Sequence, residues 1–205
     1  MNKSLTLVSA FALLLAGCSD TPKDNAQKST EKATSAQPVT GQSALFKIYQ
    51  VARTWAPDVE IVRMNSIPMS EVPEVPGKSG AWEAMLSSES KGLAKSYTYS
   101  VVESVGNLHE GVFGGAQEPA AQGPKRAPFL IGGVKVDTDA AYNTAKPKAA
   151  EYEKKAPNKR ISFLLEMNTK YSNPVWRVIW GDSVGTSGFS VLIDATTGEY
   201  LATLH

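Results

Sequence analysis

The part of the chain best suited to chemistry is the segment GDSVG at residues 181–185, which matches the pattern G-x-S-x-G and makes Ser183 a candidate nucleophile. In serine hydrolases this pattern forms a strained turn between a strand and a helix, whose N-terminus helps to stabilise the oxyanion. Here a glycine-rich run and a further strand-like segment follow Ser183, so the helix is missing. The only later histidine is His205, the last residue, where fraying prevents a stable orientation. We therefore expect a polar loop and no catalytic residue, with a small serine hydrolase that uses Ser183 as the alternative.

A protein-bound metal ion needs several ligands, and the chain offers few of the preferred kinds. It contains 2 histidines, His109 and His205, and 1 cysteine, Cys18. Carboxylates would have to complete any zinc or iron site. We expect no metal site and no cofactor, and we expect His109 to be an exposed side chain that follows a turn.

The N-terminal residues have the features of an export signal. Residues 1–17 carry one cation, Lys3, and an uncharged apolar run that is too short to span a membrane. The sequence Leu-Ala-Gly-Cys at 15–18 resembles the lipobox of bacterial lipoproteins. The resemblance implies that the signal peptide is removed before Cys18, that the thiol of Cys18 is diacylated, and that the new N-terminus is acylated.

The same resemblance implies where the protein lies. Acyl chains on Cys18 make the membrane its first partner, since several chains anchor a protein far more firmly than one. Lipoproteins with Asp directly after the cysteine stay in the inner membrane, whereas this chain has Ser19 there and Asp20 one position later. We expect the periplasmic face of the outer membrane, with the inner membrane as the alternative.

The composition argues against one class of partner, and it also places one segment outside the folded core. The chain has 21 basic and 20 acidic residues, and removal of residues 1–17 takes away Lys3 and no acid, which leaves 20 of each. A neutral chain has no electrostatic footprint for nucleic acid, so we expect none as a partner. After the lipidated Cys18, residues up to 43 are almost all small or polar and cannot offset the entropy of ordering. We expect residues 18–43 to be a disordered tether.

The remainder divides into two similar halves, residues 44–113 and 135–205, separated by a Gly/Pro-rich connector at 114–134. In each half one helix precedes three strand-like runs in which apolar side chains alternate with polar ones. The expected fold class is therefore α+β, with two helix-strand-strand-strand halves and a helix packed on antiparallel sheet. The expected strands are 58–67, 81–87 and 96–103 in the first half, and 159–167, 175–181 and 189–194 in the second.

Both expected helices have recognisable starting residues. Ser43 can cap the first helix, whose apolar side chains recur at the spacing of one buried face. Asp137 or Thr138 can cap the second. Pro147 lies inside the second helix and predicts a kink or two short helices, because proline breaks the hydrogen-bond ladder.

The last two strands resemble those of a known family. PVWRVIWG at 174–181 and FSVLIDATTGEYL at 189–201 are similar to the end of a PepSY domain, where an aromatic strand precedes a hairpin ending D-x-x-T-G-E. Residues 137–205 carry the resemblance clearly, and 44–113 carry a faded copy. The resemblance implies a PepSY or cystatin-like fold and a non-catalytic envelope module, of a kind that binds or restrains a secreted peptidase or peptide.

The candidate binding surface is aromatic. Tyr97 and Tyr99 share one face of their strand, and Trp55 lies at the end of the first helix. These three form a binding strip if the helix leaves that face uncovered. Trp82 and Trp176 are instead expected to be core anchors.

The expected function is a lipid-anchored envelope module that binds a ligand or regulates a peptidase. The alternatives are the Ser183 hydrolase and a structural lipoprotein of an envelope assembly. The Pro-rich segment 68–80 has two interpretations of equal weight: a recognition loop, because proline lowers the cost of ordering on binding, or a plain connector.

Overall fold

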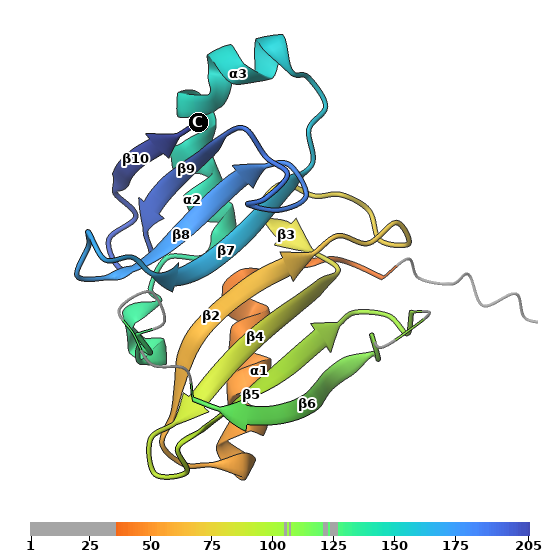
Figure 1. The fold of residues 1–205 in the computed structure, drawn as a ribbon. Helices are drawn as coiled ribbons and strands as arrows, with labels where there is room; N and C mark the ends of the chain where they lie inside the picture. The colour runs from red at the N-terminus through yellow and green to blue at the C-terminus, as the bar shows by residue number, and fades with distance from the viewer. Residues whose placement is uncertain (1–35, 105, 107, 121–122, 124–126) are drawn as a thin grey trace, which may run out of the picture. The chain divides into compact units, whose positions relative to one another are not determined.

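The structure is a computed structural model, which describes residues 36–205 apart from 105, 107, 121–122 and 124–126. The expected signal peptide, Cys18 and the tether up to residue 35 lie outside the described residues. The described part is α+β, with helices packed on an antiparallel sheet of eight strands (Figure 1). This confirms the expected fold class at that level.

The elements follow one another in a helix-then-strands order. The first group is β1 (Val39–Thr40), α1 (Gly41–Trp55), β2 (Val59–Ile67), β3 (Lys78–Ser79), β4 (Ala81–Ser88), β5 (Leu93–Ser100) and β6 (Gly111–Pro119). The second is the short 3-10 turn η2 (Ile131–Gly133), α2 (Thr138–Ala145), η3 (Lys146–Ala149), α3 (Ala150–Lys155), β7 (Ile161–Met167), β8 (Pro174–Trp180), β9 (Ser190–Asp194) and β10 (Tyr200–Leu204). The strand order in the large sheet is β10-β9-β8-β7-β2-β4-β5-β6, and β1 pairs with β3 separately.

The first helix begins two residues before the expected cap. Thr40 is the N-cap of α1 and makes no side-chain capping bond, so Ser43 is not the cap. The first amides of α1 are instead satisfied by the start of α2. Asp137 Oδ1 accepts from the Gln42 amide at 2.9 Å, and Thr138 Oγ1 accepts from the Gly41 amide at 2.8 Å. The tether prediction, which reached residue 43, is corrected at its end, because β1 and the first turn of α1 are part of the fold.

The second helix begins, and is interrupted, where the sequence predicts. Asp137 is the N-cap of α2 and accepts from the Thr138 amide at 2.7 Å. The 3-10 turn η3 contains Pro147 and separates α2 from α3, which confirms the predicted interruption.

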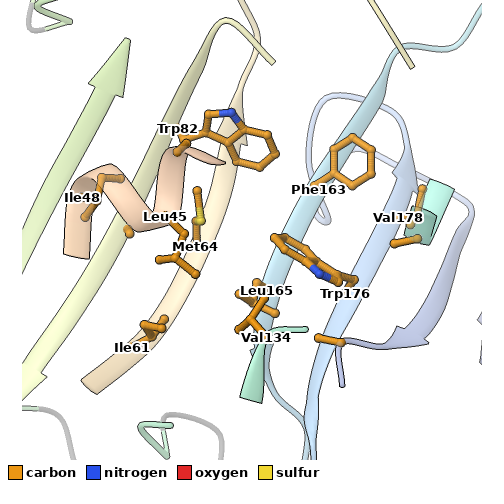
Figure 2. Close-up of a cluster of buried hydrophobic side chains, with 14 of the residues drawn as sticks. Leu45, Ile48, Ile61, Met64, Trp82, Val134, Phe163, Leu165, Trp176 and Val178 are labelled. Carbon is orange, nitrogen blue, oxygen red and sulfur yellow. The ribbon is translucent and has the colours of Figure 1, made fainter. Parts of the chain in front are cut away.

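The two groups of strands join through β2 and β7, and the helices cover the same face of both. Met64 of β2 lies opposite Leu165 of β7, and both side chains are completely buried in one core (Figure 2). Trp82 and Trp176 are also completely buried, as predicted. Directly opposite side chains of an antiparallel pair share a face, so one continuous core lies between the helices and the sheet.

The expected connector at 114–134 is wrong in its first part. Residues 111–119 form β6, which pairs with β5 at the edge of the sheet. The side chains of β6 are mostly exposed, and Gly114 and Gly115 have none, so no apolar alternation marks the strand. A strand that contributes hydrogen bonds but few buried side chains shows no alternation of apolar and polar residues in its sequence.

Candidate functional site

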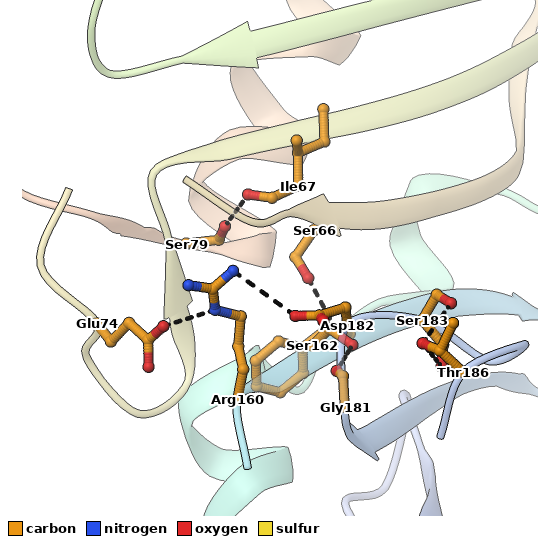
Figure 3. Close-up of polar contacts among 11 residues, drawn as sticks. Ser66, Ile67, Glu74, Ser79, Arg160, Ser162, Gly181, Asp182, Ser183 and Thr186 are labelled. Carbon is orange, nitrogen blue, oxygen red and sulfur yellow. Dashed lines mark hydrogen bonds and ion pairs between the residues drawn. The ribbon is translucent and has the colours of Figure 1, made fainter. Parts of the chain in front are cut away.

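Ser183 lies in an exposed loop between β8 and β9, as the sequence predicts. Its hydroxyl shares a 2.9 Å hydrogen bond with Thr186 Oγ1, and the chain then enters β9 (Figure 3). The ring of His205 packs against Phe189, with 5.4 Å between centroids. Within the described residues there is no cluster of three or more side chains suited to a metal ion. His109 contacts Glu103 at 2.7 Å and is partly exposed.

The expected aromatic strip is not a surface. Tyr97 and Tyr99 are only 2% and 7% exposed, because α1 packs on their face of the sheet. The Tyr99 hydroxyl accepts a hydrogen bond from Lys47 Nζ at 2.8 Å. Trp55 is half-buried at the end of α1 and donates from its indole N–H to Gln117 Oε1 at 3.0 Å. The condition for a binding strip, an uncovered face, is therefore not met.

We predict that Tyr97→Phe stabilises the protein. The Tyr97 hydroxyl is buried and has no hydrogen-bond partner among the described residues, and burial raises its pKa. Removing an unpartnered buried hydroxyl should raise the free energy of unfolding by about 1 kcal/mol, measured by chemical denaturation. Tyr99→Phe is the matched control and should lower it, because Tyr99 loses its bond to Lys47. A destabilised Tyr97→Phe would show that the hydroxyl has a partner.

The strongest candidate site is a cavity of about 250 Å³ at the junction of β2 and β7. These strands pair over only three positions, from Arg63 opposite Glu166 to Asn65 opposite Leu164. The strands then separate, and Ser66 Oγ accepts from the Phe163 amide at 2.9 Å where they part. We call the space beyond this point the fork cavity.

The Pro-rich segment 68–80 forms one wall of the fork cavity, and the beginning of β7 forms the other. The apolar part of the lining comes mainly from the segment. These side chains are Pro68, Met69, Val72, Pro73, Val75, Pro76 and Ile161. The segment, which the sequence left open between recognition loop and connector, thus lines a cavity.

Two contacts hold this wall in position. Thr138 Oγ1, at the start of α2, donates to the Gly77 carbonyl at 2.5 Å. Ser79 Oγ donates to the Ile67 carbonyl at 3.0 Å (Figure 3). Gly77 has φ +78°, and a Cβ there would lie 2.4 Å from the Asp139 Cα. Only glycine combines this backbone conformation with so close an approach.

The rim of the fork cavity is cationic. Lys78, Lys159 and Arg160 line it together with one carboxylate, Glu74. Arg160 Nε donates to Glu74 Oε1 at 2.6 Å, and an Arg160 terminal nitrogen lies 3.6 Å from Asp182 Oδ1 (Figure 3). Among the described residues neither lysine forms an ion pair within 4.0 Å. The two lysines therefore provide the uncompensated positive charge.

The sheet face opposite the helices carries charges of both signs. Arg63 and Glu166 are register partners, and Arg177 lies on the next strand. Burial raises the pKa of Glu166 although Arg177 and Arg63 oppose it, and burial lowers the pKa of Arg177.

The motif that carried the family resemblance has a structural role. Asp194 Oδ1 accepts from the amides of Thr196 and Thr197 at 2.7 and 2.9 Å, and Gly198 has φ +80°. Burial raises the pKa of Asp194, but these bonds and one from Asn173 outweigh it and hold the pKa below its usual value. The motif therefore builds the turn between β9 and β10.

No family model matches the chain, and no curated protein sequence matches it. A crystal structure at 1.85 Å resolution of a candidate lipoprotein from Clostridium difficile 630 is similar over 84% of this chain and 95% of its own. The sequence identity is 8% and the TM-score is 0.46, and a likeness at this level assigns no function. Within the described residues, no helix is both long and apolar enough to cross a membrane.

Proposed function

We propose that this chain is a lipid-anchored module of the cell envelope that binds a ligand without catalysis, and that the ligand occupies the fork cavity. The observation that carries the proposal is the construction of the cavity from two segments far apart in the sequence, 66–80 and 159–162. A concave pocket that combines apolar side chains with a few convergent polar groups is the usual form of a binding site.

The polar groups of the lining divide into two sets. The hydroxyls of Ser66, Ser79 and Ser162 are engaged within the protein, the last by donating to the Gly181 carbonyl at 2.6 Å. They therefore hold the walls in position. Lys78 and Lys159 at the rim are the charged groups available to a ligand, which favours a ligand with an apolar part and a negative charge.

The size of the cavity limits the ligand. About 250 Å³ is below the roughly 300–1,000 Å³ of pockets that enclose drug-sized molecules. The fork cavity therefore suits one or two side chains of a larger partner, or a small organic anion.

The proposal also includes the lipid anchor on Cys18 and the PepSY-like halves. The sequence at 15–18 supports lipidation of Cys18, and Ser19 supports the outer membrane rather than the inner one. The order of helix and antiparallel strands in each group supports two PepSY-like halves. Two roles for this module remain predictions from the sequence: regulation of an envelope peptidase and participation in envelope assembly.

The test uses phenylacetate, a small apolar anion, titrated into the isotopically labelled full-length protein. We expect chemical-shift changes to concentrate at residues 66–80 and 159–162. Val75→Trp should weaken binding by about tenfold or more, because the larger side chain fills the cavity that Val75 lines.

The matched control is Val184→Trp, which places the same residue at an exposed valine outside the cavity lining. It should bind phenylacetate like the wild type, and circular dichroism should show both variants folded. Shift changes elsewhere, or equal binding by folded Val75→Trp, would contradict the proposed function.

A further inference from the structure

We infer that the fork cavity binds the C-terminal end of a polypeptide, which is captured through its main chain and its free carboxylate. This inference rests on the proposed function, because it names the ligand class of the same cavity. Three features of the cavity support it: an unpaired strand edge, a closed end and an excess of positive charge.

The first feature is the main chain at the start of β7. In an antiparallel sheet the N–H and C=O of one residue point to the same neighbouring strand, and the direction alternates along the chain. The Arg160 carbonyl accepts from Gly181 on the β8 side, at 2.8 Å, and the Phe163 amide donates to Ser66 on the β2 side. The main-chain groups of Ile161 therefore point into the fork, and the β2–β7 ladder does not reach them.

A segment of polypeptide can supply hydrogen-bond partners for the main-chain N–H and C=O of Ile161. An extended chain that lies beside a free strand edge exchanges main-chain hydrogen bonds with it, and side-chain pockets then select the sequence. Here the pocket is apolar, with Met69 and Val72 in its lining. The ligand should therefore be extended and carry an apolar side chain.

The second feature is the closed end of the fork. Beyond Ile161 the strands converge, first at the bond between Ser66 and Phe163 and then at the paired residues Asn65 and Leu164. An extended chain cannot pass between strands that are hydrogen-bonded to each other. A chain end fits this space, whereas the middle of a long strand does not.

The third feature is charge, which decides between the two ends of a polypeptide. Lys159 and Arg160 directly precede Ile161, and Lys78 lies on the opposite wall. Glu74 is the single carboxylate of the lining, and Arg160 already occupies it. In a cavity of about 250 Å³ a terminal charge at the closed end still lies within about one Debye length, roughly 8 Å, of these cations, so an α-carboxylate is attracted and an α-ammonium is repelled.

The test compares the pentapeptide Gly-Ser-Gly-Ala-Leu with its C-terminal amide, by calorimetric titration into the full-length protein. We expect the free acid to bind at least about tenfold more tightly, and its affinity to fall as salt is added. The double variant Lys78→Gln/Lys159→Gln should remove about tenfold of the affinity for the acid and leave that for the amide unchanged. Lys170→Gln, on the turn between β7 and β8, is the matched control and should have no effect.

A second arm uses 4-methylpentanoate, which has the leucine side chain and carboxylate but no peptide groups. We expect it to bind more weakly than the pentapeptide, because it cannot pair with Ile161. Equal binding of acid and amide, or 4-methylpentanoate as tight as the peptide, would overturn the inference and leave the proposed function intact. Absence of peptide binding while phenylacetate still binds in the cavity would do the same. Absence of binding by every probe, phenylacetate included, would overturn the proposed function as well.

Discussion

Gly77→Ala should lower the free energy of unfolding by about 3 kcal/mol and abolish phenylacetate binding. Two costs combine at this position. A φ of +78° costs an L-residue about 1–2 kcal/mol. The new Cβ would also lie 2.4 Å from the Asp139 Cα, which is backbone of α2 and can only give way if the helix start moves. That movement displaces the wall of the fork cavity, because Thr138 holds the Gly77 carbonyl.

Gly92→Ala is the matched control for this substitution. Gly92 has φ +64°, and a Cβ there would meet no atom within 4 Å. It should cost about 1 kcal/mol, from backbone conformation alone, and binding should be unchanged. Thermal and urea denaturation measure both variants. Equal losses at the two glycines would show that the packing of the Pro-rich segment on α2 does not hold the wall.

Trp176→Ala should cost about 4 kcal/mol, within the range for truncation of a buried large aromatic side chain. The Trp176 side chain is completely buried, and its indole N–H donates to the Val136 carbonyl at 2.8 Å. It also packs where α1 begins, since a Cβ on Gly41 would lie 2.8 Å from the Trp176 ring. The substitution therefore removes core area, a hydrogen bond and the support of a helix start at once.

Trp55→Ala provides the comparison, because Trp55 is half-buried at the end of α1. The loss should be about 1 kcal/mol, and binding of phenylacetate should be unchanged, since Trp55 does not line the fork cavity. Urea denaturation measures the two stabilities. A loss of phenylacetate binding in Trp55→Ala would contradict this expectation and would indicate that the aromatic side chains form the binding surface.

The sequence predicted the elements whose signal is local. Asp137 as a cap and the interruption at Pro147 both follow from hydrogen-bonding rules that act within one turn of helix. The expectation for Ser43 failed because the amides of α1 are satisfied by residues that lie 95 and 97 positions away in the chain. No local pattern contains that information.

The sequence does not predict the proposed binding site, for a related reason. The residue types of Tyr97 and Tyr99 and their shared face suggest a binding surface, but only the packing of α1 decides whether that face is exposed. The fork cavity depends on where β2 and β7 stop pairing, a long-range event. The one signal in the sequence was the Pro-rich segment 68–80, and nothing local connected it with Lys159 and Arg160.

A crystal structure grown with 4-bromophenylacetate tests most directly whether the fork cavity is a ligand site. Anomalous scattering locates the bromine without reference to any assumed position of the ligand. We expect the strongest bromine peak between the Pro-rich segment and the start of β7, in contact with Met69, Val72 or Ile161. A bromine bound elsewhere on the molecule, with the fork cavity empty, would contradict it.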